Sequence, residues 1–239
     1  MARDVALQSR AARTGEAVLS IYSWSRPTLS FGRNQPASGL YDLDKIEEAR
    51  IDVVRRPTGG RAILHYREVT YSVTAPIDGA PLNETYSRIN EILQLGLGRL
   101  GVLVEAAAGA ERATVPSVRP CFETPAKGEL IAGGAKLVGS AQWRDEGALL
   151  QHGSILVDDD QSLLLSLSMS PVAYSWAPPA SLHSLLGRAP DVAEVARVMR
   201  EAVQLLEDDE VAELDEADVR AGMLERVPHF LDEGWTWRR

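Results

Sequence analysis

The sequence predicts an α+β fold, because strand-like segments predominate before residue 160 and helix-like segments predominate after residue 190. The chain has 239 residues, which is enough for one substantial core with a small appended lobe. No internal repeat indicates a solenoid or a propeller. We therefore expect a main domain over residues 1–185 and a helical C-terminal extension over residues 186–239 that packs on it.

The first third of the chain predicts short strands separated by turns. Alternating or continuous apolar runs predict strands over residues 17–24, 28–31, 51–54, 62–65 and 69–73. Residues 2–14 have helix-forming composition. Leu43 to Arg50 has helical character, with Ile46 and Ala49 on one side.

The middle of the chain predicts one helix followed by paired strands. Apolar residues recur at helical spacing from Leu82 to Leu97, which predicts an amphipathic helix that ends near Gly101. Residues 109–120 read as a loop. Gly133-Gly134 separates two strand-like runs and predicts a tight hairpin, and Asp145-Glu146-Gly147 separates the next pair of strands.

The last third of the chain predicts a loop-rich segment and then helices. Asp191 has the character of an N-cap, with Glu194 at capping-box spacing and an apolar stripe that continues to Leu206. A last short helix is expected from about Asp215 to Arg226. Trp235 and Trp237 are expected to dock the C-terminal tail.

Composition excludes several classes of protein. The net charge is −9, which argues against a nucleic-acid partner because there is no basic surplus to neutralise phosphates. No apolar run approaches the roughly 18 residues needed to span a bilayer, so we expect no membrane association. A single cysteine excludes an intrachain disulfide framework, and the N-terminus lacks a secretory apolar region. We therefore expect a cytoplasmic protein.

The one cysteine, Cys121, lies in the run Arg-Pro-Cys-Phe-Glu, and Lys136 follows it at a distance of fifteen residues. An ammonium within a few ångströms favours the thiolate, which is the form that attacks carbonyl carbon. A free cysteine is more often a small buried hydrophobe. On these residues alone both interpretations stay open.

Residues 55–61 (Arg-Arg-Pro-Thr-Gly-Gly-Arg) combine three cations with two adjacent glycines. The glycines would let backbone N–H groups approach a carbonyl or phosphate oxygen closely. A solvated turn with surface arginines explains the pattern equally well.

Three ordered stretches resemble one superfamily. Signatures of the lipoate–protein ligases, octanoyltransferases and biotin ligases are similar to residues 55–65, to residues 136–142 followed by residues 150–156, and to residues 22–35. The resemblance implies an α+β catalytic domain related to the class II tRNA synthetases, with a mixed sheet flanked by helices. Family members usually begin with a strand before the first helix, and residues 1–7 resemble the start of that helix, so we expect the strand to be absent or the start codon to be misplaced.

Within this superfamily the chain resembles the cysteine-dependent octanoyltransferases. The third position of the first signature is Arg61, where ATP-dependent lipoate ligases carry a third glycine, and Cys121 falls on the nucleophile of the octanoyltransferases. The resemblance implies catalytic roles for Cys121 and Lys136. It also implies substrate-binding roles for Arg55, Thr58, Gly59, Gly60, Arg61, His65, Gly139, Ser140, Ala141, His152 and Gly153.

The implied reaction is a ping-pong acyl transfer. Cys121 would take an octanoyl group from an octanoyl-carrier protein and pass it to a lysine of a lipoyl-carrying protein, either the glycine-cleavage carrier or a dehydrogenase lipoyl domain. Amides near Gly59-Gly60 or Gly139-Ser140 would stabilise the oxyanion. Because a thioester is already activated, we expect no cofactor and no metal; the alternative is a ligase that uses ATP and Mg to form an acyl-adenylate. A third hypothesis is a non-catalytic protein that binds the carrier.

The two histidines of the signatures, His65 and His152, are candidate bases. A histidine after a strand is more often a hydrogen-bonded core residue, and we favour that interpretation for both. Gln142 and Gln151 are likewise expected to be structural.

Overall fold

Two sheets organise the part of the chain that the structure describes. The computed structural model describes residues 1–77, 79, 81–108, 120–169 and 177–238. The helices are α1 (Ala2–Thr14), α2 (Leu43–Glu48), α3 (Leu82–Arg99), α4 (Leu163–Ser166), α5 (Leu182–Leu186), α6 (Val192–Leu206), α7 (Ala217–Leu231) and α8 (Glu233–Thr236). The strands are β1 (Val18–Tyr22), β2 (Thr28–Phe31), β3 (Asp52–Arg55), β4 (Ile63–His65), β5 (Glu68–Pro76), β6 (Glu105–Ala106), β7 (Leu130–Ala132), β8 (Ala135–Asp145) and β9 (Ala148–Leu156).

The larger sheet has the strand order β1-β5-β9-β8-β7-β6, and each neighbouring pair is antiparallel. Two-residue turns close its hairpins. Gly133 and Gly134 join β7 to β8 with φ of 57° and 81°, and Glu146 and Gly147 join β8 to β9 with φ of 47° and 84°. Positive φ at both central positions matches the right-handed twist of the flanking strands. Both predicted hairpins are confirmed.

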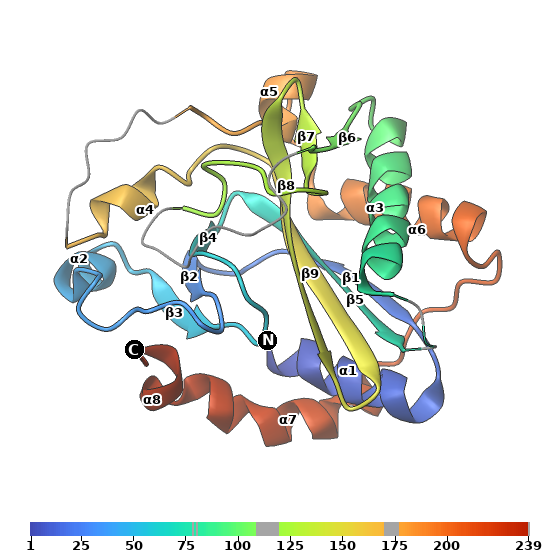
Figure 1. Ribbon diagram of the computed structural model, residues 1–239, viewed down its shortest axis with the longest axis horizontal. Coiled ribbons are helices and arrows are strands. Elements are labelled where there is room, and N and C mark those ends of the chain that lie inside the picture. The colour runs from blue at the N-terminus through green and yellow to red at the C-terminus, as the bar shows by residue number, and fades with distance from the viewer. Residues whose placement is uncertain (78, 80, 109–119, 170–176, 239) are drawn as a thin grey trace.

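Helices cover the two faces of this sheet, as Figure 1 shows, with α3 beside α6 and α1 beside α7. The apolar stripes of α3 and α6 pack against one face and bury Leu93, Met199 and Ile155. Gly96 lets α6 approach closely, because a Cβ at this position would lie 2.5 Å from the sulfur of Met199. Helix α1 packs on β5 and β9 from the other face.

The smaller sheet has the order β3-β2-β4, with β2 parallel to β3 and antiparallel to β4. Its apolar side is closed by α2, α4 and the C-terminal tail. The ring of Trp237 meets Phe31 edge-on at 5.4 Å, and Trp235 Nε1 donates to the carbonyl of Arg55 at 3.0 Å. The predicted docking of the tail by these two tryptophans is confirmed.

Most predicted elements are present with shifts of one to three residues at their ends. Asp191 caps α6 by accepting from the amide of Glu194 at 2.8 Å, as its position predicts. The last helix is longer than expected, since α7 continues past Pro228 to Leu231. The loop expected over residues 109–120 lies outside the described residues except for Pro120. The division of the chain near residue 185 stays a prediction.

The predicted fold class is confirmed: strands predominate before residue 160 and helices after residue 190, the smaller sheet is mixed and helices flank the larger sheet. Among the described residues, no helix has the length and apolarity that crossing a bilayer requires.

Candidate active site

Cys121 lies in a short irregular segment, residues 120–129, which we call the cysteine loop. Its amide donates to the carbonyl of Ala62 at 2.9 Å, so the first residues after the glycine pair hold the loop in place. Phe122 is buried with Ile63 and Leu156, and the half-buried Cys121 packs against this cluster. The thiol is therefore anchored by its neighbours and is not enclosed in the main core.

Lys136, at the start of β8, points back to the cysteine loop. Its Nζ donates to the carbonyl of Cys121 at 2.8 Å and lies 3.5 Å from the sulfur. The ammonium also lies 5.0 Å from the ring centre of Phe122 and 2.7 Å from the carboxylate of Glu129. The structure thus brings together the two residues for which the sequence predicts catalytic roles.

Two glycines make room for this arrangement. A Cβ at Gly139 would lie 3.1 Å from Lys136 Cε and 3.2 Å from the Phe122 ring. A Cβ at Gly153, on the neighbouring strand, would lie 2.2 Å from the carbonyl oxygen of Gly139 and 2.7 Å from Tyr71. A side chain at Gly139 would displace Lys136 or Phe122, and one at Gly153 would displace Gly139 or Tyr71, so both predicted glycines leave space that their neighbours occupy.

Residues 55–61, which we call the arginine loop, fold around the side chain of Arg56. This guanidinium is buried and donates to the carbonyls of Gly59, Arg61 and Ser30 at 2.8–3.1 Å. Gly60 has a φ of 97°, which L side chains rarely adopt. Within the described part of the chain, no hydrogen bond uses the amides of Gly59 and Gly60. These amides remain available to a ligand oxygen.

Arg61 joins the arginine loop to the cysteine loop. Its guanidinium pairs with Glu123 at 3.1 Å and donates to Thr124 at 3.3 Å. Only 8% of Arg61 is exposed. Together with the Cys121–Ala62 hydrogen bond, this pair explains how two motifs sixty residues apart form one site.

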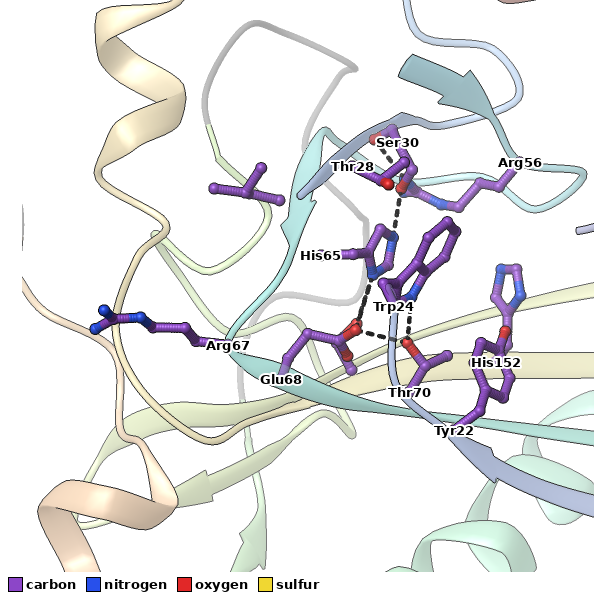
Figure 2. Close-up of polar contacts among 12 residues, drawn as sticks. Tyr22, Trp24, Thr28, Ser30, Arg56, His65, Arg67, Glu68, Thr70 and His152 are labelled. Atoms are coloured by element: carbon purple, nitrogen blue, oxygen red, sulfur yellow. Dashed lines mark hydrogen bonds and ion pairs between the residues drawn. The ribbon is translucent and has the colours of Figure 1, made fainter. Parts of the chain in front are cut away.

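His65 lies in a buried polar network between the two sheets (Figure 2). Its ring stacks on Trp24 with centroids 4.4 Å apart, its Nε2 lies 2.8 Å from Ser30 Oγ, and its Nδ1 lies 3.3 Å from Glu68. His152 lies nearby, 2.6 Å from Thr58 Oγ1 and 3.5 Å from Asp4. Burial lowers the pKa of His152. Both histidines are hydrogen-bonded core residues, as we favoured from the sequence.

Arg55 is placed differently from the other arginines. It is fully buried, and its nitrogens donate to carbonyls of Gly32 and Gln35 and to carbonyls of the C-terminal tail at 2.6–3.2 Å. Its hydrogen bonds go to the protein's own backbone, so its predicted role in binding substrate has no support from its position. It attaches the tail to the smaller sheet.

Two tyrosines near the site, Tyr71 on β5 and Tyr86 on α3, come from elements that carry no signature. Ser140 Oγ lies 2.6 Å from the hydroxyl of Tyr71, which accepts from Gln151 at 3.0 Å. Burial raises the pKa of Tyr71 to about 12 and also raises that of Tyr86, which lies near Ser140 on the side of α3. The helical spacing of apolar residues from Leu82 to Leu97 predicts only burial for Tyr86. Ala141 pairs with His152 across β8 and β9.

A family comparison agrees with this geometry. Residues 1–204 match the family described as the lipoyl protein ligase A/B catalytic domain. The chain belongs to this family. The match covers both loops, Lys136 and the sheet that supports them.

Two relatives that are similar in sequence to this chain are both named octanoyltransferase LipM. The octanoyltransferase LipM of Carboxydothermus hydrogenoformans is 40% identical over 197 residues, which cover 80% of this chain and 72% of that protein. The octanoyltransferase LipM of Kyrpidia tusciae is 44% identical over 161 residues, which cover 64% of this chain and 59% of that protein. The chain thus spans between about three fifths and three quarters of the length of these relatives. The predicted likeness to the octanoyltransferases is confirmed.

Solved structures of family members share the fold. Lipoate–protein ligase A bound with ATP superposes with a TM-score of 0.82 at 21% identity, covering 99% of this chain and 92% of that one. A bipartite lipoate–protein ligase of Thermoplasma acidophilum superposes with a TM-score of 0.80 at 19% identity, covering 99% and 89%. At these identities the likeness establishes the fold alone.

Proposed function

We propose that this protein is an octanoyltransferase that acts through a thioester on Cys121. The observation that carries the proposal is the position of Lys136, whose buried ammonium lies 3.5 Å from the sulfur of the one cysteine in the chain. A positive charge at this distance favours the nucleophilic form of a thiol. We infer that the acyl group is octanoyl from the LipM relatives, which are named octanoyltransferases.

In the first half-reaction the Cys121 sulfur attacks the carbonyl carbon of an octanoyl thioester on a carrier protein. The C–S bond to Cys121 forms and the carbonyl becomes an oxyanion, for which the unused amides of Gly59 and Gly60 are candidate donors. Collapse breaks the C–S bond to the carrier, whose thiolate leaves and takes a proton. The octanoyl group remains on Cys121.

In the second half-reaction the amine of a lysine on a lipoyl-carrying protein attacks the Cys121 thioester. The amide bond forms, the amine loses a proton and the Cys121 thiolate leaves. The glycine-cleavage carrier and a dehydrogenase lipoyl domain are both candidate acceptors. Neither half-reaction consumes ATP, because the thioester bond already activates the acyl group.

Intact-mass measurement tests this proposal. The protein is mixed with octanoyl-carrier protein without ATP, and in a second arm with free octanoate, ATP and Mg. We expect an adduct of octanoyl mass in the first arm and none in the second. The Cys121→Ala variant should form no adduct in either arm. An adduct that requires ATP, or that persists in Cys121→Ala, would overturn the proposal in favour of an acyl-adenylate ligase or another nucleophile.

A further inference from the structure

Glu129, the residue before β7, lies against the ammonium of Lys136. Both carboxylate oxygens are 2.7 Å from Nζ, and Oε2 also accepts from the amide of Ala126 at 2.7 Å. Glu129 is 6% exposed and Lys136 is 3% exposed. The carboxylate of Glu129 is therefore held by the amide of Ala126 in the cysteine loop, and it in turn holds the ammonium of Lys136.

The hydrogen bonds of Lys136 determine where its charge points. An ammonium has three N–H donors. One faces Glu129, one faces the carbonyl of Cys121 at 2.8 Å, and the sulfur of Cys121 lies 3.5 Å from the same nitrogen. With two donors occupied on either side, the third is directed to the sulfur. Glu129 thus takes part in aiming the ammonium.

The same contact partly neutralises the ammonium. The Lys136–Glu129 pair has no net charge, so ionisation of the half-buried Cys121 would leave this group of three residues with one net negative charge. An opposite charge favours ionisation of a group and a like charge opposes it. Glu129 therefore has two opposed effects, since it positions the positive charge and also offsets it.

We propose that Glu129 is a positioning residue of this site, which holds the Lys136 ammonium against Cys121 and restrains ionisation of the thiol. The positioning effect favours acyl transfer, and the restraint keeps the resting sulfur less reactive towards other electrophiles. The proposal rests on the thiol chemistry proposed above.

Other charged and titratable groups face this trio from several elements. Arg56, from the arginine loop, is a buried cation near Cys121. Tyr71 from β5 and Tyr86 from α3 lie near Glu129, and burial raises the pKa of both hydroxyls, so they remain neutral. The neighbouring acid Glu123 is paired with Arg61. Glu123 offers a matched control, because it lies in the same loop and contacts a different cation.

The test is the pH dependence of Cys121 alkylation by iodoacetamide in the full chain, which needs no acyl substrate. Glu129→Gln removes the negative charge at constant size. We expect the midpoint of the alkylation profile to fall by about one pH unit. Octanoyl transfer should nevertheless fall about tenfold or more, because the ammonium keeps its contact with the carbonyl of Cys121 but loses the carboxylate that orients it.

Two variants separate charge from position. Glu129→Asp keeps the charge but withdraws it by one methylene, so we expect an unchanged alkylation midpoint and slower transfer. Glu123→Gln removes an acid that contacts Arg61, so its midpoint should move less than that of Glu129→Gln. An unchanged or raised midpoint in Glu129→Gln would overturn the proposal, and so would an equal shift in Glu123→Gln.

Loss of the carboxylate alone leaves Lys136 buried without a counter-ion, which can prevent folding. The double variant Lys136→Met with Glu129→Gln removes both charges, so it leaves no unpaired buried charge and tests the proposal if the single variant does not fold. We expect its alkylation midpoint to lie above that of the native protein, and a midpoint equal to the native one would overturn the proposal. If the native protein forms no octanoyl adduct but these shifts are observed, the proposed function fails and this inference stands.

Discussion

Thr58 Oγ1 and His152 Nε2 lie 2.6 Å apart, and this contact ties the arginine loop to the centre of the larger sheet. The imidazole is also 3.5 Å from Asp4 on α1. One buried ring thus links a loop, a strand and the N-terminal helix. The protonation state of His152 should therefore affect the stability of the region that supports the site.

Acidification should destabilise the protein through His152. Burial lowers the pKa of this imidazole. Below about pH 6.5 the imidazole therefore binds a proton in the unfolded chain but stays neutral in the folded chain. The free energy of unfolding falls as a result. Asp4 does not contribute in this range. Burial opposes its ionisation, but nearby positive charge and hydrogen bonds from His152 and Ser72 hold its pKa well below the usual range.

Urea unfolding at pH 7.5 and pH 5.5 measures this effect. We expect the native protein to lose about 1 kcal/mol over that interval from this group, and His152→Gln to lose less. His183 is exposed, so His183→Gln is the control for replacement of a histidine outside this buried network. Equal pH dependence in the native protein and His152→Gln would contradict this account.

Substitution of Gly139 should impair catalysis. A methyl group there would lie 3.1 Å from Lys136 Cε and 3.3 Å from its Nζ, so in Gly139→Ala the end of the Lys136 side chain must shift from its position beside Cys121. We expect octanoyl transfer to fall at least about tenfold, since small displacements of catalytic groups are costly. Gly98→Ala is the matched control, because an added Cβ there meets nothing within 4 Å on an exposed part of α3. That variant should transfer at the native rate and gain about 0.5–1 kcal/mol in stability.

Loss of the bridge made by Arg61 should loosen the cysteine loop. Arg61→Lys keeps the charge but cannot contact Glu123 and Thr124 together. We expect slower transfer with a change in unfolding free energy of about 1 kcal/mol or less. Transfer by Arg61→Lys at the native rate would show that the bridge has no role in placing Cys121.

Removal of Arg55 should detach the C-terminal tail. Burial lowers the pKa of Arg55 to about 10, which leaves the guanidinium charged at neutral pH and able to donate to the tail carbonyls. Arg55→Met leaves several buried carbonyls without donors, so we expect a loss of about 3 kcal/mol or more. Limited proteolysis after residue 231 should then become faster. Cleavage and unfolding at native levels would contradict this structural role.

The sequence predicts local elements well where the signal is itself local. The stripe and N-cap of α6 and the glycine pair between β7 and β8 each lie within a few consecutive residues, and both elements are present. The strand β6 was not predicted, because its two residues, Glu105 and Ala106, are exposed and carry no apolar pattern. The continuation of α7 past Pro228 was not predicted either, since proline usually ends a helix.

The site shows the same division. The resemblance to the octanoyltransferases predicted catalytic roles for Cys121 and Lys136, and the structure places the sulfur and the Nζ of these residues 3.5 Å apart. Glu129 lies between these two residues in the chain, but nothing in the order of residues shows that its carboxylate contacts Lys136. Tyr86 lies on a helix whose spacing predicts only burial. Such contacts depend on how the hairpin and α3 pack together.

By itself the sequence determined the family likeness and named Cys121, Lys136 and the glycine pair as candidates, because these residues stand in locally ordered motifs. Only the tertiary structure decided which charges meet. Arg55, Arg56 and Arg61 are neighbours in the chain, yet one holds the C-terminal tail, one shapes its own loop and one reaches the cysteine loop. The three side chains differ in the direction in which they point and in the partners that bury them. Both differences arise from packing between segments that are far apart in the chain.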